Sequence, residues 1–404
     1  MAMKFLDDVD LKGKRVLMRV DFNVPLDKNR QVTDDKRIQA VVPSLRKLIE
    51  EQCRVVLASH LGRPKGKVVA EMSLQPVAEC LSGLIGRPVT VAPDCIGPEV
   101  TRLVEALQPG QVLLLENLRF HPEEEQNDPG FSQALASLCD IYVNEGFAVS
   151  HRAHASVQGI TSYAKICAGG YQLQQEISTF HKAFDHPQRP VAVVIGGAKV
   201  SSKIGVLTNI LPKTEHLFIG GAMANTFLKA RGLTVGASLV EDEYLDTARD
   251  LLGQAAKAGV TVHLPVDVVV AAGLDDGANA REVSVDEIPP GMQALDVGPQ
   301  TVKQFIAALK TCRTIVWNGP LGVFETPPFH QATFALAEFL GSAQALTVIG
   351  GGDSAAAVKK AGVADKVSYV STGGGAFLEM MEGKVLPGIA ALEECARRAV
   401  SSTP

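Results

Sequence analysis

The sequence predicts an α/β fold in which strands and helices alternate around parallel sheets. Short apolar runs rich in β-branched residues recur along the chain, and longer stretches rich in Ala, Leu, Glu, Lys and Gln separate them. The chain has 404 residues, and 46% of them are hydrophobic. This is enough to build more than one core, so we expect two or three domains.

The predicted strands fall into two halves of the chain. In the first half they are residues 16–20, 55–59, 89–91, 112–115 and 141–143. In the second half they are residues 191–195, 216–219, 262–264, 314–317, 346–349 and 367–370. A turn at Gly169-Gly170 precedes a polar, helix-like stretch, 172–184, so we expect the boundary between the halves near this turn.

The residues that follow the strands differ between the halves, and in open parallel sheets ligands bind beyond these carboxyl ends. First-half strands run into the polar segments Asp21-Phe22-Asn23, His60-Leu61-Gly62-Arg63-Pro64, Glu116-Asn117-Leu118-Arg119-Phe120 and Asn144-Glu145-Gly146-Phe147. Second-half strands run into Gly196-Gly197-Ala198-Lys199, Gly220-Gly221-Ala222, Asn318-Gly319-Pro320, Gly350-Gly351-Gly352-Asp353-Ser354 and Gly373-Gly374-Gly375. We therefore predict that one half grips a small anion with side chains, that the other lays backbone against a nucleotide, and that a group is transferred between the two ligands.

The first half carries side chains suited to a phosphorylated acid. Strand alternation puts Arg19, Asp21 and Asn23 on one face, where a carboxylate and an amide suit a hydroxyl group. Four arginines suit bidentate capture of phosphate or carboxylate, and His60 adds a donor. These arginines are Arg37, Arg63, Arg119 and Arg152. Each one alone would more often be a solvated or ion-paired surface residue, but convergence at one sheet edge favours binding.

Three further features have ordinary explanations. His151 and His154 have a spacing that can bind metal on a helix, but no third ligand stands out. The glutamates at 123–125 are interpreted as a solvated loop. The seven cysteines are scattered and form no Cys-x-x-Cys pair. We therefore expect reduced, mostly buried thiols in a cytosolic protein, without a structural zinc site.

The second half carries the features of a polyphosphate site. Glycines after a strand let backbone N–H groups approach phosphate at a helix N-terminus. Lys199 and Lys203 would share one face if a helix begins at this point. Asp353 is either a Mg²⁺ ligand or a helix N-cap, and Glu325 is either a ribose contact or a surface carboxylate.

Two nucleotide-binding classes lack their motifs in this sequence. No Gly-x-x-x-x-Gly-Lys-Ser/Thr is present, which excludes a P-loop NTPase. No intact Gly-x-Gly-x-x-Gly follows the first strand, which disfavours a dinucleotide-dependent dehydrogenase.

Charge and hydropathy bear on partners and location. The formal net charge of −5 offers no overall field that attracts nucleic acid or anionic lipid, so we expect neither partner. No run approaches the roughly 18 apolar residues of a spanning helix. The first ten residues include Lys4, Asp7, Asp8 and Asp10, which is not the pattern of a signal peptide.

Several of these motifs together resemble those of the phosphoglycerate kinase family, in order and over almost the whole chain. They are Asp21-Phe22-Asn23-Val24-Pro25, Ser59-His60-Leu61-Gly62-Arg63-Pro64, Glu116-Asn117-Leu118-Arg119-Phe120, Gly196-Gly197-Ala198-Lys199-Val200, Trp317-Asn318-Gly319-Pro320 and Gly350-Gly351-Gly352-Asp353-Ser354. The resemblance implies two Rossmann-like domains with parallel sheets. Residues 1–169, with 389–404 returning to them, would bind phosphoglycerate, 170–185 would form a hinge helix, and 186–388 would bind the nucleotide.

The resemblance also implies the reaction and its residues. The reaction is reversible, Mg²⁺-dependent transfer from 1,3-bisphosphoglycerate to ADP, giving 3-phosphoglycerate and ATP, with domain closure, in a cytoplasmic monomer. The implied phosphoglycerate site is Asp21, Asn23, Arg37, His60, Arg63, Arg119 and Arg152. The implied catalytic groups are Arg37, Lys199, Gly373 and Gly374. The implied nucleotide contacts are Lys203, Gly220, Gly221, Leu295, Asn318, Pro320, Glu325, Gly352, Asp353 and Ser354, with Asp353 at the metal.

Three segments depart from the family pattern. The chain has Val143-Asn144-Glu145-Gly146-Phe147-Ala148 where the family usually reads Val-Asn-Asp-Ala-Phe-Gly, and Ser202-Lys203-Ile204 in place of Asp-Lys-Ile. It has Gly170-Tyr171-Gln172-Leu173-Gln174-Gln175-Glu176 where a Leu-Met-x-Lys-Glu pattern is usual. Two alternatives stay open from the sequence: another two-domain α/β enzyme such as a dehydrogenase, and a binding module without turnover.

Overall fold

The computed structural model describes residues 3–401, and the chain divides into two compact units. The first unit comprises Met1–Ile177 and Val385–Pro404, and the second comprises Ser178–Lys384. Helix α6, Tyr171–Phe184, begins in the first unit and ends in the second. Each unit is built on its own parallel six-stranded sheet, which confirms the predicted α/β class.

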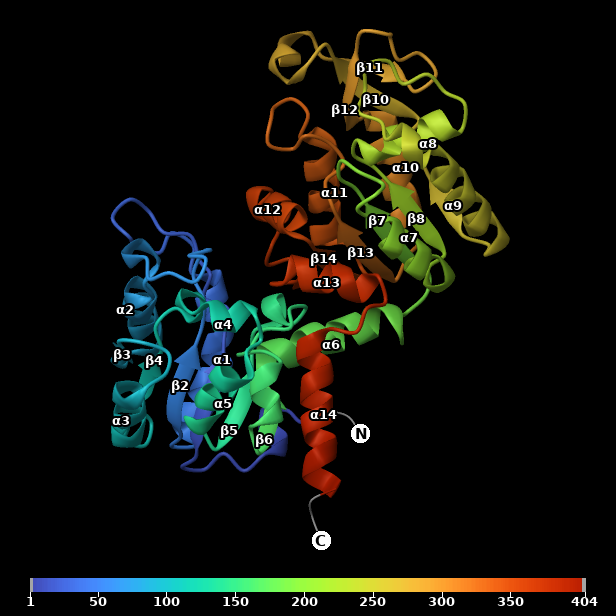
Figure 1. Ribbon diagram of the computed structural model, residues 1–404. Coiled ribbons are helices and arrows are strands. Elements are labelled where there is room, and N and C mark those ends of the chain that lie inside the picture. The colour runs from blue at the N-terminus through green and yellow to red at the C-terminus, as the bar shows by residue number, and fades with distance from the viewer. Residues whose placement is uncertain (1–2, 402–404) are drawn as a thin grey trace. The chain divides into compact units, whose positions relative to one another are not determined.

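The sheet of the first unit has the strand order β3-β4-β2-β1-β5-β6, and all of its pairs are parallel (Figure 1). Its strands are β1 Arg15–Arg19, β2 Arg54–Ala58, β3 Val89–Val91, β4 Val112–Leu114, β5 Ile141–Asn144 and β6 Ile166–Gly169. The first five lie within one residue of the predicted ranges. Strand β6 was not predicted, because its sequence Ile-Cys-Ala-Gly carries a single β-branched residue.

Helices cover the faces of this sheet, as expected when parallel strands are joined by crossovers. They are α1 Lys36–Glu50, α2 Gln75–Ile85, α3 Pro98–Ala106, α4 Pro122–Glu125, α5 Pro129–Ser137 and α14 Pro387–Ser401. The core between β1, β2 and α1 is aliphatic and includes the fully buried Met18, Leu57 and Leu45. Helix α14 contacts the edge strand β6, so the returning end of the chain completes the first unit (Figure 1).

The parallel sheet of the second unit has the order β15-β14-β13-β7-β8-β9. Its strands are β7 Val191–Ile195, β8 His216–Ile219, β9 Thr261–His263, β13 Thr314–Asn318, β14 Leu346–Gly350 and β15 Tyr369–Val370. They match the predicted ranges to within one residue, except that β15 begins two residues later than predicted. A buried aromatic cluster packs on this sheet, with the Phe218 and Phe305 ring centroids 5.1 Å apart in an edge-to-face arrangement.

The second unit also contains an antiparallel three-stranded sheet that was not predicted. Its order is β11-β10-β12, and its strands are β10 Asp267–Ala271, β11 Arg281–Ser284 and β12 Gln293–Val297. The helices of the unit are α7 Ile204–Ile210, α8 Met223–Ala230, α9 Leu245–Lys257, α10 Pro299–Leu309, α11 Gln331–Ser342, α12 Gly352–Lys360 and α13 Gly374–Met381. None of the helices described within residues 3–401 is both long enough and apolar enough to cross a membrane.

The expectation that all cysteines are free thiols is wrong for two of them. The sulfur atoms of Cys167 in β6 and Cys395 in α14 are bonded, and their Cα atoms are 6.1 Å apart. The packing of α14 on β6 brings together two cysteines that are 228 residues apart in sequence, which spacing along the chain could not reveal. The other five cysteines are free, as expected.

Candidate functional site

An acidic and basic pair lies at the carboxyl end of β1 in the first unit. The Asp21 side chain is mostly buried, and its Oδ2 lies 2.8 Å from Arg37 Nη1. The same guanidinium nitrogen donates to the Asn23 carbonyl oxygen at 3.2 Å. The Asn23 side-chain oxygen in turn accepts from the Gly62 N–H at 2.9 Å. The structure therefore joins Asp21, Asn23 and Arg37 to the segment that follows β2, as the shared sheet edge predicted.

His60 is buried at this edge as a neutral imidazole. Its Nδ1 lies 3.2 Å from Arg19 Nη2 and 4.0 Å from Asp21 Oδ1. Burial lowers the pKa of His60 well below its usual range, and the nearby positive charges of Arg19, Arg119 and Arg152 lower it further. Because Arg19 can only donate, His60 Nδ1 is the acceptor of this contact, and the neutral ring offers its other N–H to a ligand without adding a further charge.

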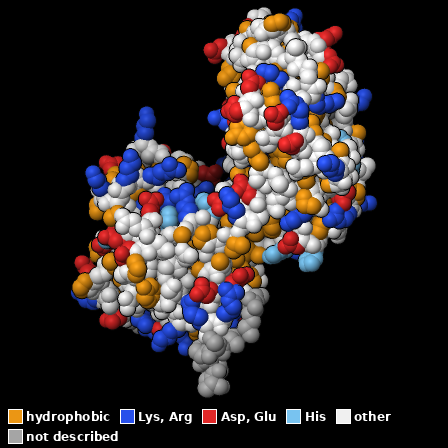
Figure 2. All heavy atoms as spheres, turned by 45° about the vertical axis from the view of Figure 1, so that its right-hand side comes forward, with side chains coloured by type: hydrophobic (Ala, Val, Ile, Leu, Met, Phe, Trp, Pro, Cys, Tyr) orange, Lys and Arg blue, Asp and Glu red, His pale blue; other side chains and the backbone are white. Residues whose placement is uncertain are grey.

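The other predicted arginines of the first unit differ in how firmly they are held. Arg119 is buried, donates to the Gly62 carbonyl oxygen at 2.9 Å and pairs with Glu125 at 3.3 Å. Arg152 Nε lies 3.4 Å from His151 Nε2. Arg63 is exposed, and within residues 3–401 no hydrogen bond or ion pair ties its side chain to this group. Figure 2 shows Lys and Arg side chains, with His among them, gathered on one face of the first unit.

Sequence reasoning gave no role to a buried network that supports these groups. Arg19 is fully buried and donates from Nε to Ser156 Oγ at 2.8 Å. Ser156 donates from its hydroxyl to Glu124 Oε1 at 2.6 Å and from its N–H to Oε2 at 2.9 Å. The buried charge of Glu124 is therefore balanced by Arg19 and by two donors. The sequence signal of this network was Arg19, a charged residue inside the apolar run 16–20.

The interpretation of residues 123–125 as a solvated loop is therefore wrong for Glu124. These residues lie in α4, and Glu124 points into the protein with no exposed surface. Burial raises the pKa of Glu124, while the charge of Arg19 opposes the rise. A run of three glutamates does not reveal that one of them faces inward, because that depends on the partner at residue 156.

The two histidines at 151 and 154 lie among positive charges. Burial and the nearby Arg19, Arg119 and Arg152 lower the pKa of His154 to about 3. The buried Glu124 carboxylate lies 3.8 Å from His154 Nδ1, so this histidine faces one negative charge as well as several positive ones. Among the described residues, one group brings three metal-ligating atoms within 4.8 Å of one another, namely Asp94, Cys95 and His121. His121 Nε2 and Asp94 Oδ1 already bond to each other at 2.6 Å.

Backbone hydrogen bonds join the strand-end turns of the second unit. The Gly196 N–H donates to the Asn318 carbonyl at 2.9 Å, and the Gly197 N–H donates to the Pro320 carbonyl at 3.0 Å. A Cβ on Gly221, where φ is +67°, would lie 2.6 Å from the backbone nitrogen and oxygen of Gly197. Gly221 is therefore needed for the close packing of neighbouring turns as well as for its left-handed conformation.

The two predicted lysines do not share a helical face. Helix α7 begins at Ile204 with Lys203 as its N-cap, so Lys199 precedes the helix in an irregular segment. Lys203 Nζ donates to Asn318 Oδ1 at the end of β13. Burial lowers the pKa of Lys203, and the charge of Asp353 opposes this. Lys199 is exposed. The prediction of a common face fails because the chain forms a turn over residues 201–203 before it becomes helical.

Asp353 lies in the first turn of α12 and is not its cap. The N-cap is Gly351, where φ is +93°, and the Asp353 side chain is exposed. The following residue, Ser354, accepts from the Gly319 N–H at 2.7 Å through its hydroxyl oxygen. This leaves the Asp353 carboxylate at a helix N-terminus, where negative charge is favoured and where Mg²⁺ would find an oxygen ligand.

The remaining predicted contacts occupy different places in the second unit. Gly373 caps α13, and a Cβ on Gly374 would lie 2.9 Å from the Gly351 Cα, so the turns before α12 and α13 are neighbours. Gly220 follows β8 and packs against Leu321. Leu295 lies in β12 and packs with Ala271 and Phe329. Glu325 is exposed in the segment between β13 and α11.

Arg37 and Arg119 are paired at the carboxyl edge of the first unit's sheet, and packed glycine turns lie at the carboxyl edge of the second unit's parallel sheet. These features define an α/β protein equipped to bind phosphorylated ligands. The chain belongs to the phosphoglycerate kinase family, because the model of that family, described as "Phosphoglycerate kinase", matches residues 6–384.

Curated relatives and solved structures agree with this membership. A phosphoglycerate kinase of Syntrophobacter fumaroxidans is 63% identical over 396 residues, which cover 98% of this chain and 100% of that protein. One of Synechococcus elongatus is 55% identical, covering 97% of this chain and 98% of that protein. The structure of phosphoglycerate kinase from Coxiella burnetii has a TM-score of 0.89 at 41% identity and covers 98% of this chain and 100% of that one. The structure from Pyrococcus horikoshii has a TM-score of 0.84 at 29% identity, with the same coverage.

Proposed function

We propose that this chain catalyses the phosphoglycerate kinase reaction of glycolysis. In this reaction a phosphoryl group passes reversibly from 1,3-bisphosphoglycerate to ADP, which gives 3-phosphoglycerate and ATP. Membership of the family over residues 6–384 is the observation that carries this proposal. The chain is thus a phosphotransferase whose acceptor in the reverse direction is a carboxyl group.

The proposed phosphoglycerate site is the arginine-rich edge of the first unit. Asp21 and Asn23 would accept and donate hydrogen bonds to the hydroxyl group of the acid, and Arg37, Arg119 and His60 would meet its anionic groups. Contacts support this assignment because Arg37 and Asn23 are already joined to Asp21 and Gly62 at 2.8 to 3.2 Å. Arg63 and Arg152 complete the set proposed from the sequence.

The proposed nucleotide site is the glycine-lined edge of the second unit. The N–H groups at the start of α12 and α13 suit the phosphate groups, and the ammonium of Lys203 suits their charge. Closely packed turns support this assignment, because they keep side chains away from the backbone that a phosphate would approach. The other proposed contacts are Gly220, Gly221, Leu295, Asn318, Pro320, Glu325, Gly352 and Ser354.

Transfer itself requires positioning and charge stabilisation from the protein. The attacking carboxylate of 3-phosphoglycerate is ionised near neutral pH, so no general base is needed. Negative charge spreads over the equatorial oxygens of the phosphoryl group in the transition state. We assign Arg37, Lys199 and the N–H groups of Gly373 and Gly374 to that charge. The exposure of Lys199 is consistent with a group that reaches a ligand.

We also propose that the reaction uses Mg²⁺ held by Asp353. The donor chemistry fits, because Mg²⁺ commonly takes one or two protein carboxylates together with nucleotide oxygens, and the Asp353 carboxylate is exposed. When bound, the ion neutralises phosphate charge and orients the nucleotide. Asp353 lies close enough to Lys203 for its negative charge to oppose the lowering of that lysine's pKa by burial.

Three broader properties complete the proposal. We expect the protein to be cytoplasmic and monomeric. Sedimentation of the purified chain as a dimer would contradict the monomeric state. We also expect the two domains to close when both substrates are bound, which would exclude water from the transfer. An unchanged radius of gyration in solution scattering with both substrates would contradict closure.

A coupled assay of ATP-dependent phosphorylation of 3-phosphoglycerate tests the function. We expect turnover that depends on both substrates. A change in nicotinamide absorbance without the coupling enzyme would favour the dehydrogenase alternative. Binding of both ligands without turnover would favour the binding module and contradict the proposed function.

A further inference from the structure

The disulfide between Cys167 and Cys395 lies at the place where the chain leaves and re-enters the first unit. Cys167 is in β6, shortly before the first unit ends at Ile177. Cys395 is in α14, shortly after the chain returns at Val385. The bond closes a loop with a sequence separation of 228 residues, and this loop contains the whole of the second unit.

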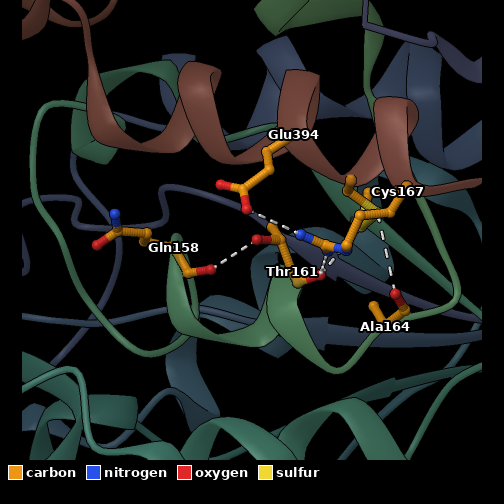
Figure 3. The surroundings of a disulfide bond; sticks show 7 residues. Gln158, Thr161, Ala164, Cys167 and Glu394 are labelled. Atoms are coloured by element: carbon orange, nitrogen blue, oxygen red, sulfur yellow. Dashed lines mark hydrogen bonds and ion pairs between the residues drawn. A yellow bond between two sulfur atoms is a disulfide. The ribbon is translucent and has the colours of Figure 1, made fainter.

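Helix α14 is the element that this bond holds to the first unit (Figure 3). Its residues Ala391, Leu392 and Ala396 are buried against the unit. At the start of the helix, the Gly388 N–H donates to the Ser150 carbonyl at 2.9 Å. Figure 3 shows Glu394 on α14 facing the turn that carries Thr161, with Cys167 beside it. In the second half of the helix Ala396 is also buried and Arg398 donates to the Thr161 carbonyl, so the bond adds a covalent tie to these non-covalent contacts and bears on whether that half stays docked.

An arginine–glutamate ion pair lies near the bond. Arg398 donates to the Thr161 carbonyl and pairs with Glu394 at 3.4 Å. The Cys167 sulfur lies 3.9 Å from the same Thr161 carbonyl, so the guanidinium and the sulfur share a neighbour. A neighbouring cation stabilises a thiolate, which is the reactive form of cysteine in thiol–disulfide exchange.

The remaining cysteines are less suited to this chemistry. Burial raises the pKa of Cys53 to about 11 and that of Cys139 to about 12, and it also raises the pKa of Cys80, Cys95 and Cys312. These five cysteines are free. Geometry therefore selects one pair for oxidation, because its two sulfurs are the ones within bonding reach of each other.

We propose that Cys167 and Cys395 form a redox-sensitive clasp that holds α14 on β6 when oxidised and lets the second half of α14 open when reduced. Disulfides in reducing compartments are usually transient or redox-sensing, which favours a switch over a permanent bond in a cytoplasmic protein. The bond itself is buried, so exchange requires prior opening of α14 near its end, where helices fray.

The reductant of this step is a dithiol. Its thiolate attacks one sulfur of the Cys167–Cys395 bond and forms a mixed disulfide, and the other cysteine leaves as a thiolate that takes up a proton. The second thiol of the reductant then displaces the first cysteine. Two electrons and two protons pass to the protein, and the dithiol leaves as its own disulfide. Oxidised glutathione reverses the step in the same two exchanges.

Two measurements on the full-length chain test the clasp. Thiols are first counted by alkylation in denaturant and mass spectrometry, after native incubation over a range of reduced-to-oxidised glutathione ratios. We expect the count to change from five to seven across these ratios in the wild type. A count of seven at every ratio would mean that no bond forms. A count that stays at five in excess dithiol would mean a permanent bond, and either result overturns the proposal.

Hydrogen exchange then shows what the bond does. We expect the second half of α14, residues 394–401, to exchange at least about tenfold faster in excess dithiol than in oxidised glutathione. Cys395→Ser should exchange fast in both buffers, and Cys80→Ser, which keeps the pair, should behave as the wild type. Equal exchange of the oxidised and reduced wild type would overturn the proposal without depending on any variant.

Discussion

The carboxylate of Glu145 occupies the space in which a side chain on Gly170 would lie. Glu145 follows β5, is almost fully buried, and accepts hydrogen bonds from the Ser44 hydroxyl and from the Gln172 N–H at the start of α6. Both residues lie in segments that depart from the usual sequence pattern of the family. The structure connects the two segments, because the Glu145 carboxyl group accepts a hydrogen bond at the start of the helix that leaves the first unit and requires a glycine beside it.

Adding a methyl group at this contact should destabilise the protein. We expect Gly170→Ala to lower the free energy of unfolding by about 1–3 kcal/mol, because the new Cβ overlaps the Glu145 carboxylate and neither group can move into solvent. Urea denaturation measures this. The control is Gly253→Ala in α9, where a Cβ meets nothing within 4 Å and helix propensity favours alanine. Equal midpoints for Gly170→Ala and wild type would contradict the packing.

The buried carboxyl of Glu145 should also make stability depend on pH. Burial raises its pKa from 4.5 to about 8, and hydrogen bonds from Ser44 and Gln172 oppose the rise. The folded state therefore binds more protons than the unfolded chain between these values, so the free energy of unfolding falls as pH rises through this window. Glu145→Gln keeps a neutral group there and should show a smaller fall. Parallel pH profiles of the two proteins would contradict the raised pKa. The pKa of Asp296 is also raised to about 8. Its effect on the pH dependence of stability is the same in the wild type and in Glu145→Gln, so it cancels when the two profiles are compared.

Lys199 should matter for turnover and not for folding. We expect Lys199→Ala to lower kcat at least about a hundredfold, which corresponds to a loss of about 3 kcal/mol of transition-state stabilisation. Its exposed side chain predicts an unchanged unfolding midpoint. Lys257→Ala, which removes another exposed lysine of the second unit, is the matched control in the coupled assay. Near-normal turnover of Lys199→Ala would remove this residue from the mechanism.

Asp353 should determine how activity depends on Mg²⁺. We expect Asp353→Asn to require at least about tenfold more Mg²⁺ for half-maximal activity, because the amide replaces a charged oxygen ligand. The variant should unfold within about 1 kcal/mol of wild type, the usual contribution of a carboxylate at a helix N-terminus. Asp365→Asn, at another exposed position of the second unit, should titrate as the wild type. An unchanged Mg²⁺ titration of Asp353→Asn would exclude it as a ligand.

Strands were predictable from the sequence, and several side-chain environments were not. Apolar β-branched runs such as 191–195 are strands whatever surrounds them, and the residues after them were the right ones to examine. Strand β6 lacks that clear pattern. The antiparallel sheet interrupts the alternation of strands with helices, and the run of valines at 268–270 in its strand β10 was a signal that was missed. Helix α7 begins at Ile204 because a turn over residues 201–203 precedes it, and the hydrophobic periodicity of the sequence does not indicate this turn.

Burial of charge and contacts between distant residues were also beyond the sequence. Ser156 joins the buried Arg19 and Glu124. It is 137 residues from Arg19 and 32 residues from Glu124 in sequence. Cys167 and Cys395 meet only because α14 packs on β6. The family resemblance gave the list of site residues, whereas the structure gave the contacts that hold them in place.

The assignment of one ligand to each unit is tested most directly by calorimetric titration of two variants with two ligands. Arg37→Ala should bind 3-phosphoglycerate at least about tenfold more weakly, or about 1.4 kcal/mol, and bind ATP as the wild type does. Lys203→Ala should show the reverse pattern. The assignment would be contradicted if each variant lost affinity for both ligands. It would also be contradicted if each variant bound both ligands as the wild type does.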